Sequence, residues 1–274
     1  MGRFGFLLVI VVCFDAWSAP VKLMVGDSWP PFAFREKGRA VGMSVDIVRA
    51  AFKNVGEEIE LVQVPYPRCL AQTQSGKFPA CFNSARSKDM DADFLFPKEP
   101  LFKSKGLIVS LRTGTPLKVQ KVKDLEGRTV ALPNGFPFGV EFDENSKINK
   151  VFTANDLTSL MMLNSRRVDF VAIDEYVFYY YLKNKPEFRD RFKIMVEMSE
   201  EPIYVHFSKK HPETKNLMKK FEMGLSMLKA SAGYKSILEN WVGPDGQRSV
   251  NVTSVVYHPA HLREPLYFPD LLPE

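Results

Sequence analysis

Short apolar segments alternate with amphipathic segments along most of this chain, and that alternation is the feature that most constrains its fold. Residues 21–25 and 59–64 are typical of buried strands, while 46–54 has apolar side chains at helical spacing. A helix at about 68–74 and a strand at 80–82 continue the order. Strands that alternate with helices form mostly parallel sheets with right-handed connections, so the sequence predicts an α/β fold.

A second series of the same kind follows farther along the chain. Apolar segments at 106–110, 129–132 and 168–173 are predicted to be strands. Helices are expected after Gly135, from Asn155, from Asp174, at 212–230 and at 233–241, with a further strand at 203–207. The chain is long enough for one large α/β domain or for two smaller lobes, each with its own core.

The first 19 residues have the pattern of a secretory signal peptide. Arg3 precedes an apolar run at 4–14, and small residues at Ala16 and Ser18 permit cleavage between Ser18 and Ala19. About eleven apolar residues are too few to cross a bilayer core that needs roughly twenty. The sequence therefore predicts a signal peptide at 1–19 and a periplasmic mature protein.

Charged residues are spread along the chain rather than gathered into a basic patch. The formal net charge is +5, from 37 Lys and Arg against 32 Asp and Glu. A scattered balance of this kind is typical of solvated surfaces, so nucleic acid is not an expected partner. The sequence has no close Cys/His cluster, so we expect neither a metal site nor a cofactor.

Two cysteines, Cys69 and Cys81, remain once a signal peptide containing Cys13 is removed. In an oxidising compartment they could form a disulfide that closes a short loop and stabilises the fold by about 3 kcal/mol. The sequence does not give the distance between their Cα atoms, so paired and free cysteines both remain open.

Residues 244–274 differ in composition from the rest of the chain. They hold five of the 19 prolines and show little hydrophobic periodicity. Proline removes a backbone donor and interrupts helices and central strands. We expect an extended C-terminal tail, to which the sequence assigns no role.

Several short motifs resemble those of one known family in their order and spacing. They lie at 29–32 (WPPF), 41–46 (VGMSVD), 83–86 (NSAR) with 93–94 (DF), 168–172 (VDFVA) and 233–241 (GYKSILENW). Over about residues 21–243 the chain resembles the family 3 extracellular solute-binding proteins, the substrate receptors of polar amino-acid ABC importers.

That resemblance implies a two-lobed, type II periplasmic-binding-protein fold with a ligand cleft between the lobes. Two hinge strands, expected near 104–110 and 202–207, would join the lobes. Lobe 1 would comprise 20–106 plus 204–243, and lobe 2 would comprise 107–203. The expected partners are a small amino acid or related carboxylate and the membrane permease of an ABC importer, and the protein is expected to be a monomer.

The resemblance also assigns candidate ligand-binding residues in lobe 1. Arg86 matches the arginine that grips the ligand's carboxylate, because a guanidinium presents a planar fork to two oxygens. Trp29 and Phe32 occupy the positions that sandwich the ligand's side chain, with core packing as the alternative. Cys81 and Asn83 lie in a segment that contacts the ligand.

In lobe 2, Asp174 resembles the acid that pairs with the ligand's ammonium group, although it could equally cap the next helix. Gly135 would open a helix whose free N–H groups attract a carboxylate. The chain departs from the family pattern there, because Phe136 and Pro137 replace small hydroxyl residues. Gly135 and Phe136 are nevertheless candidate ligand-binding residues.

Three functions remain open from the sequence. The first is ligand capture for an importer, and the second is ligand sensing by a binding module. The third is an enzyme on the same fold, similar to cyclohexadienyl dehydratase, with Glu175 as the acid. Arg68 is a possible second cation at the cleft. We assign no catalytic residue.

Overall fold

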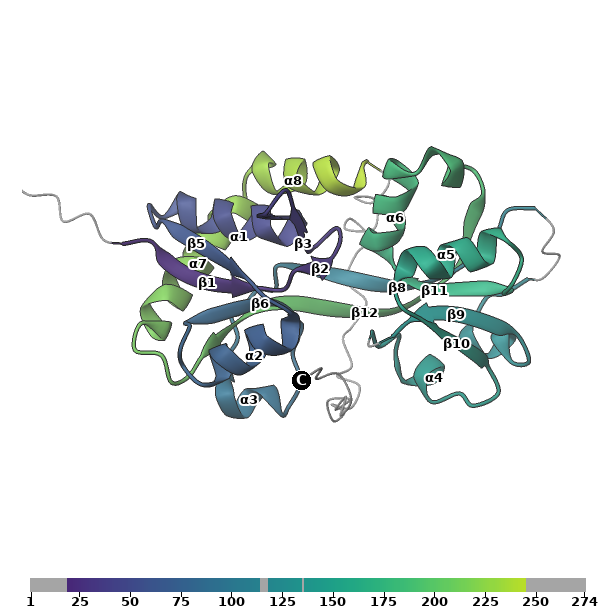
Figure 1. The fold of residues 1–274 in the computed structure, drawn as a ribbon, viewed down its shortest axis with the longest axis horizontal. Helices are drawn as coiled ribbons and strands as arrows, with labels where there is room; N and C mark the ends of the chain where they lie inside the picture. The colour runs from purple at the N-terminus through teal and green to yellow at the C-terminus, as the bar shows by residue number, and fades with distance from the viewer. Residues whose placement is uncertain (1–18, 114–117, 135, 245–274) are drawn as a thin grey trace, which may run out of the picture.

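The computed structural model describes residues 19–113, 118–134 and 136–244. In these residues strands and helices alternate, and the elements gather into two lobes (Figure 1). The α/β prediction is confirmed. The expected signal peptide at 1–19 and tail at 244–274 lie outside the described residues apart from Ala19 and Pro244, and Gly135 lies outside them as well.

Lobe 1 is built on three parallel strands, with β1 between β5 and β6. The helices α1, α7 and α8 pack on one side of these strands, and α2 and α3 on the other (Figure 1). The elements are β1 (Val21–Val25), β5 (Ile59–Gln63), β6 (Ala80–Ala85), α1 (Met43–Asn54), α2 (Tyr66–Gln74), α3 (Met90–Asp93), α7 (Thr214–Lys229) and α8 (Ala232–Val242).

Alternate residues of β1 face the two sides of the lobe 1 sheet, as the two-residue period of a strand requires. Leu23 and Val25 belong to the core that α1 and α7 also line. Met24 faces the opposite side, where it packs with Cys69 of α2 and Cys81 of β6. A small separate sheet, β2 (Ser28–Trp29), β3 (Ala33–Glu36) and β4 (Arg39–Val41), follows β1.

Lobe 2 repeats the plan, with β9 between β10 and β11 in parallel pairing. Asn155 caps α5 through its side chain, which accepts a hydrogen bond from the backbone N–H of Thr158 (2.9 Å), as expected. The elements are β9 (Thr129–Pro133), β10 (Asn149–Thr153), β11 (Phe170–Asp174), α4 (Val140–Asp143), α5 (Asp156–Asn164) and α6 (Glu175–Asn184), with 3-10 turns at Val122–Leu125 and Pro186–Phe188.

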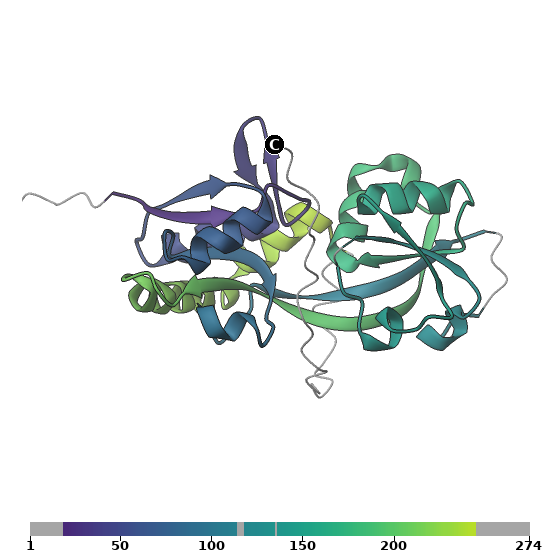
Figure 2. The ribbon, with the colours of Figure 1, turned by 60° about the horizontal axis from the view of Figure 1, so that its bottom comes forward.

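Two long antiparallel strands, β8 (Phe102–Leu111) and β12 (Phe192–Ser208), run through both lobes (Figure 2). Within the described residues they complete a nine-stranded sheet in the order β10-β9-β11-β8-β12-β6-β1-β5, with the short β7 (Phe94–Leu95) also paired to β12. The parallel pairs therefore lie within each lobe, and the antiparallel strands connect the lobes.

The pairing of β8 and β12 is irregular midway between the lobes. Leu107 pairs with Glu197 and Lys105 with Glu200, so Gly106 lies opposite the two residues Met198 and Ser199. A Cβ atom on Gly106 would lie 3.0 Å from the ring of Phe138 and 3.3 Å from the side chain of Met198. A larger residue here would therefore require Phe138 or Met198 to shift, and glycine allows both side chains to lie close to the strand.

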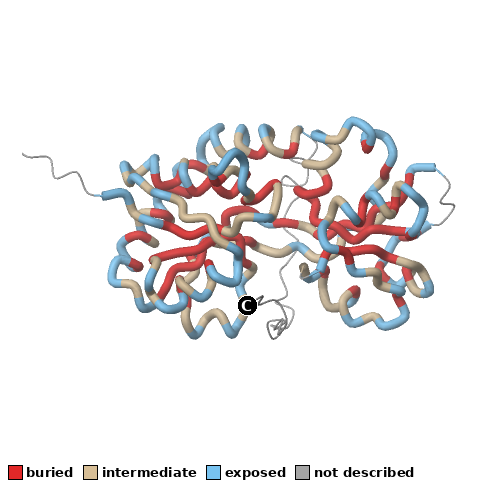
Figure 3. Tube along the Cα trace, in the orientation of Figure 1, coloured by how far each residue is buried: buried red, intermediate tan, exposed pale blue. Residues whose placement is uncertain are grey.

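Buried residues form a core in each lobe, and buried segments also continue into the strands between them (Figure 3). An aromatic cluster marks this connection. Phe32 of lobe 1 stacks on Phe102 of β8 with ring centroids 5.1 Å apart, and Tyr176 of α6 meets the edge of both rings. None of the described helices is long and apolar enough to cross a lipid bilayer.

Candidate functional site

The carboxyl ends of the parallel strands of the two lobes lie at the region between them, where ligands bind in open α/β sheets. Trp29 follows β1, Tyr66 follows β5 and Arg86 follows β6. From lobe 2, Phe136 follows β9 and Asp174 ends β11. The candidate site is therefore this interlobe face.

Trp29 and Phe136 bring the two lobes into aromatic contact. Their ring centroids lie 5.9 Å apart, and Phe136 in turn packs against Phe138 at 5.0 Å. Both residues were expected to bind ligand, and the structure places them on opposite sides of the interlobe face. The bulky Phe136 therefore contributes an apolar wall where the family pattern has small hydroxyl residues.

Phe32 has the core packing that the sequence left open as its alternative role. It is completely buried, between Trp29 at 4.4 Å and Phe102 at 5.1 Å. The sequence alone could not choose between the two roles, because the partner Phe102 is distant in sequence. Trp29 covers Phe32 and is the outer member of this pair.

Arg86 is accessible, with 52% of its side chain exposed. Its guanidinium donates two hydrogen bonds to Asp91, from Nε at 2.8 Å and from Nη2 at 3.1 Å, and it lies 5.4 Å from the centre of the Phe96 ring. This is the two-pronged geometry with which arginine binds any carboxylate. An exposed ion pair contributes only about 0–1 kcal/mol, so a ligand carboxylate can compete with Asp91.

Asn83 lies at an irregularity in β6, next to the register shift at Tyr204 and Val205 of β12. Its backbone has a positive φ of 76°, which asparagine adopts more readily than most residues. The residue is 9% exposed, and its side-chain oxygen has no hydrogen-bond partner in the described part of the chain. Because a buried unpaired acceptor is costly, this oxygen suits a ligand N–H donor.

Asp174 is buried and already bound within the protein. Its carboxylate accepts hydrogen bonds from the backbone N–H groups of Tyr176 (2.9 Å) and Val177 (3.1 Å), and Ser104 donates a hydroxyl to it. The alternative role of helix cap is therefore present. Burial raises the pKa of Asp174 to about 8, although the Ser104 hydrogen bond opposes that shift and nearby Glu175 adds to it.

Glu175, the candidate acid of the enzyme alternative, is also buried. Its carboxylate accepts a hydrogen bond from the backbone N–H of Lys105 at 3.0 Å. The two acids of lobe 2 thus stabilise the start of α6 and the adjoining strand β8.

The structure bears on three further candidates. Cys81 is fully buried and forms a disulfide with Cys69, with Cα atoms 6.0 Å apart, and it packs with Met24. Arg68 is exposed on α2, and its role as a second cation stays a prediction. The helix expected from Gly135 begins only at Val140, so the residues after that glycine do not form a helix N-terminus for an anion.

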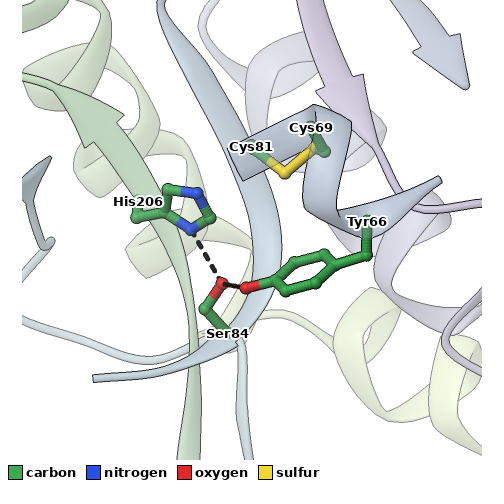
Figure 4. Close-up of a disulfide and its surroundings, with 5 residues drawn as sticks. All are labelled: Tyr66, Cys69, Cys81, Ser84 and His206. Atoms are coloured by element: carbon green, nitrogen blue, oxygen red, sulfur yellow. Dashed lines mark hydrogen bonds between the residues drawn. A yellow bond between two sulfur atoms is a disulfide. The ribbon is translucent and has the colours of Figure 1, made fainter. Parts of the chain in front are cut away.

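A hydrogen-bonded chain of three residues, absent from the sequence expectations, lies beside the disulfide (Figure 4). The Tyr66 hydroxyl lies 2.5 Å from Ser84 Oγ, which lies 2.9 Å from His206 Nδ1. His206 is completely buried, and burial lowers its pKa to about 3, so the ring is neutral. Ser84 belongs to the NSAR motif, but its partners come from α2 and β12.

The family model of the bacterial extracellular solute-binding proteins, family 3, matches residues 21–244. This chain belongs to that family. The matched residues include both lobes and both connecting strands, β8 and β12.

Solved structures show the same fold at low sequence identity. The second substrate-binding domain of GlnP from Lactococcus lactis, in an open conformation, has a TM-score of 0.66 and 20% identity, over 82% of this chain and 96% of that one. The GluR0 ligand-binding core from Nostoc punctiforme, in complex with L-glutamate, has a TM-score of 0.64 and 20% identity, over 82% and 100%. The arginine-, lysine-, histidine-binding protein ArtJ from Geobacillus stearothermophilus has a TM-score of 0.62 and 23% identity, over 84% and 99%. The two-lobed type II fold is thereby confirmed.

This family 3 solute-binding protein has a hollow of about 340 Å³ at the amino end of β1. Lys22, Lys77 and Lys220 line it together with Glu57 and Glu213. The hollow lies at the amino ends of the lobe 1 strands, opposite the interlobe face. Lys220 and Glu57 form a salt bridge there. The interlobe face, with its cation, hydroxyl, amide and aromatic groups, is the better candidate site.

Proposed function

We propose that this protein captures a small amino-acid-like ligand between its lobes in the periplasm and delivers it to the permease of an ABC importer. The observation that carries the proposal is the family match over residues 21–244, which spans both lobes. Several similar structures are amino-acid-binding domains, and one is the second substrate-binding domain of a putative amino-acid ABC transporter from Streptococcus pneumoniae. The apolar run at 4–14 supports export.

In this proposal the ligand bridges the lobes and favours their closure. Arg86 binds a carboxylate, the Asn83 oxygen accepts from an ammonium or amide N–H, and Trp29 and Phe136 enclose the rest of the ligand. Ligand shifts the open–closed equilibrium only through its greater affinity for the closed form. The irregular pairing opposite Gly106 is the natural place for the strands to bend.

We propose that the lobes divide in β8 at 106/107, as expected, and in β12 near Met198–Ser199, before the boundary expected at 203/204. The pairing of β8 with β12 supports a crossing around Gly106 and around Met198–Ser199. The crossing in β12 therefore precedes the expected hinge at 202–207, since Val205 and Phe207 pair with β6 inside lobe 1.

We propose binding rather than catalysis for the interlobe face. The Ser84 and His206 pair has the composition of a nucleophile and base. However, a neutral His206 with a pKa of about 3 is a weak general base, and Ser84 is buried. Glu175, the other candidate acid, accepts a hydrogen bond from the backbone N–H of Lys105, which is a structural role.

A thermal-shift screen of residues 20–274 tests the proposal. The panel contains the twenty amino acids, dicarboxylates, sugars and prephenate. A ligand at one hundred times its Kd adds about 2.7 kcal/mol of stability, or about 5–10 °C in Tm. A shift with an amino acid supports the proposal. A shift with prephenate accompanied by aromatic product would replace it with the dehydratase alternative, and no shift with any amino acid would contradict it.

A further inference from the structure

The protonation of His206, at the buried end of the chain, decides which atoms donate and which accept in the hydrogen bonds of Tyr66, Ser84 and His206. His206 is completely buried, and Phe94 and Phe96 flank its ring at 4.7 and 6.3 Å between centroids. Its Nδ1 meets Ser84 Oγ, and its Nε2 has no hydrogen-bond partner among the residues that the structure describes. A neutral imidazole carries one proton, so one ring nitrogen donates and the other accepts.

The position of that proton decides the role of every hydroxyl in the chain. A buried N–H donor without a partner is rarer in proteins than an unsatisfied acceptor. The proton is therefore favoured on Nδ1, where Ser84 Oγ accepts it. Ser84 then uses its own proton to donate to the Tyr66 oxygen, and the Tyr66 proton remains for an acceptor outside the chain.

We infer that Tyr66, Ser84 and His206 form a one-way hydrogen-bond relay, in which His206 orients Tyr66 as a proton donor towards an anionic oxygen of the ligand. The inference deepens the proposed function, because it adds a specificity-determining residue to the interlobe face. With the opposite tautomer, Nε2–H, Ser84 would donate to His206 and Tyr66 would donate to Ser84. Tyr66 would then offer the ligand a lone pair and favour a cationic group.

The surroundings of Tyr66 suit this role. The Tyr66 side chain is partly exposed at the start of α2, whereas its hydroxyl is largely buried where it meets Ser84, its hydrogen-bond partner among the described residues. Its ring lies beside Gly26 at the end of β1, where an added Cβ would be 3.6 Å from the Tyr66 Cβ. Desolvation raises the pKa of Tyr66 above 10.0, so the hydroxyl keeps the proton it donates.

The disulfide fixes the geometry of the relay. Cys69 lies one helical turn after Tyr66 on α2, and Cys81 lies on β6, three residues before Ser84. The bond between them ties together the two elements that carry the first two members of the relay (Figure 4).

The first test reads the tautomer without any ligand. Long-range 1H–15N correlation spectra of residues 20–274 distinguish Nδ1–H from Nε2–H in each neutral histidine. The chain has four histidines, and His206→Gln assigns the relevant signals by their loss. We expect Nδ1 protonated and Nε2 bare. A protonated Nε2 would overturn the inference, whatever the protein binds.

The second test measures selectivity by calorimetry with L-arginine, L-glutamine and L-glutamate, each compared with its α-carboxamide. Tyr66→Phe should weaken binding of the free acid about 10- to 100-fold, the range for a hydrogen bond to a charged group, and the carboxamide less. Ser84→Ala should reduce the same acid-to-amide preference by a smaller factor. Equal losses for acid and amide, or no loss, would overturn the inference.

Tyr234→Phe is the matched control, because it also removes a tyrosine hydroxyl bond, to Leu101 O at 2.7 Å, away from the relay. It should lower stability without changing the acid-to-amide preference. If none of the three amino acids binds, the proposed ligand class fails for these probes, while the tautomer measurement still decides the relay.

Discussion

The two lobes present different chemistry to the region between them. Lobe 1 presents the three polar groups that we propose for ligand binding: the half-exposed Arg86, the unpaired oxygen of Asn83 and the hydroxyl of Tyr66. Lobe 2 offers Phe136, while its two acids, Asp174 and Glu175, are buried and bound to the protein's own backbone.

This difference suggests a division of work between the lobes. Lobe 1 carries the polar recognition, and lobe 2 supplies an apolar cover that meets Trp29 at 5.9 Å. The two acids of lobe 2 bind backbone N–H groups of α6 and β8. The following substitutions test that division, beginning with the largest expected effect.

The first prediction concerns Asp174. Burial raises its pKa from 3.8 to about 8, so between these values the folded protein holds a proton that the unfolded chain has released. This group therefore lowers the free energy of unfolding as pH rises from about 4 to about 8. An asparagine in its place would still cap α6 but cannot titrate. Asp174→Asn should gain up to about 4 kcal/mol relative to the parent protein between pH 5 and pH 8.

Urea unfolding of both proteins at several pH values measures this. The difference between the two curves isolates Asp174, because Asp156, whose pKa burial raises to about 6, and His206 titrate in both. Parallel curves would mean that Asp174 is ionised in the folded protein. A large loss of ligand affinity in the same variant would return Asp174 to the ligand-binding residues.

The second prediction concerns the Cys69–Cys81 disulfide of lobe 1, which lies beside the relay. The double variant Cys69→Ala and Cys81→Ala removes this bond, which closes a loop with a sequence separation of 12. Its free energy of unfolding should fall by about 3 kcal/mol in urea titrations. Reduction of the parent protein should have the same effect. If the double variant is as stable as the parent, the disulfide does not constrain this lobe.

The third prediction concerns recognition by lobe 1. Arg86→Ala should weaken ligand binding by about 2 kcal/mol, or about 30-fold, because the ligand's carboxylate would remain unpaired in the closed protein. Calorimetry with the best amino acid of the panel measures the loss. Arg189→Ala is the control, as Arg189 is an exposed arginine that follows the 3-10 turn at Pro186–Phe188. Unchanged affinity in Arg86→Ala would remove Arg86 from the site.

The fourth prediction concerns the cover from lobe 2. Phe136→Ala should weaken binding by about 1 kcal/mol, the typical contribution of an aromatic pair such as Phe136 and Trp29. The same calorimetry applies, with Phe152→Ala as control because Phe152 is 63% exposed on β10. Equal effects of the two variants would show that the contact with Trp29 does not contribute to closure.

The sequence predicts the α/β order because period-two and helical patterns are local. It does not predict the full length of β12, because the polar run at Glu197–Glu201 interrupts the apolar pattern and only pairing with β8 keeps it extended. Resemblance alone also could not decide whether Phe32 contacts ligand or packs in the core. Phe32 becomes core because Phe102 lies beneath it.

The relay is the clearest case of what one sequence conceals. Tyr66 and His206 are 140 positions apart, and they meet only because β6 pairs with β12 and the disulfide holds α2 against β6. Ser84 lies within a recognised motif, yet nothing local shows that its hydroxyl joins two distant side chains. The Cys69–Cys81 pair, which the sequence left open, is the one long-range contact that composition could suggest.

The most direct test of ligand-induced closure is the fluorescence of Trp29 during titration with each of the twenty L-amino acids. Trp29 and Trp241 are the tryptophans of residues 20–274, so Trp241→Phe leaves Trp29 as the single reporter, next to Phe136 of the other lobe. The account predicts a saturable change with at least one amino acid, and a smaller response in Phe136→Ala. No saturable change with any of them would contradict binding between the lobes.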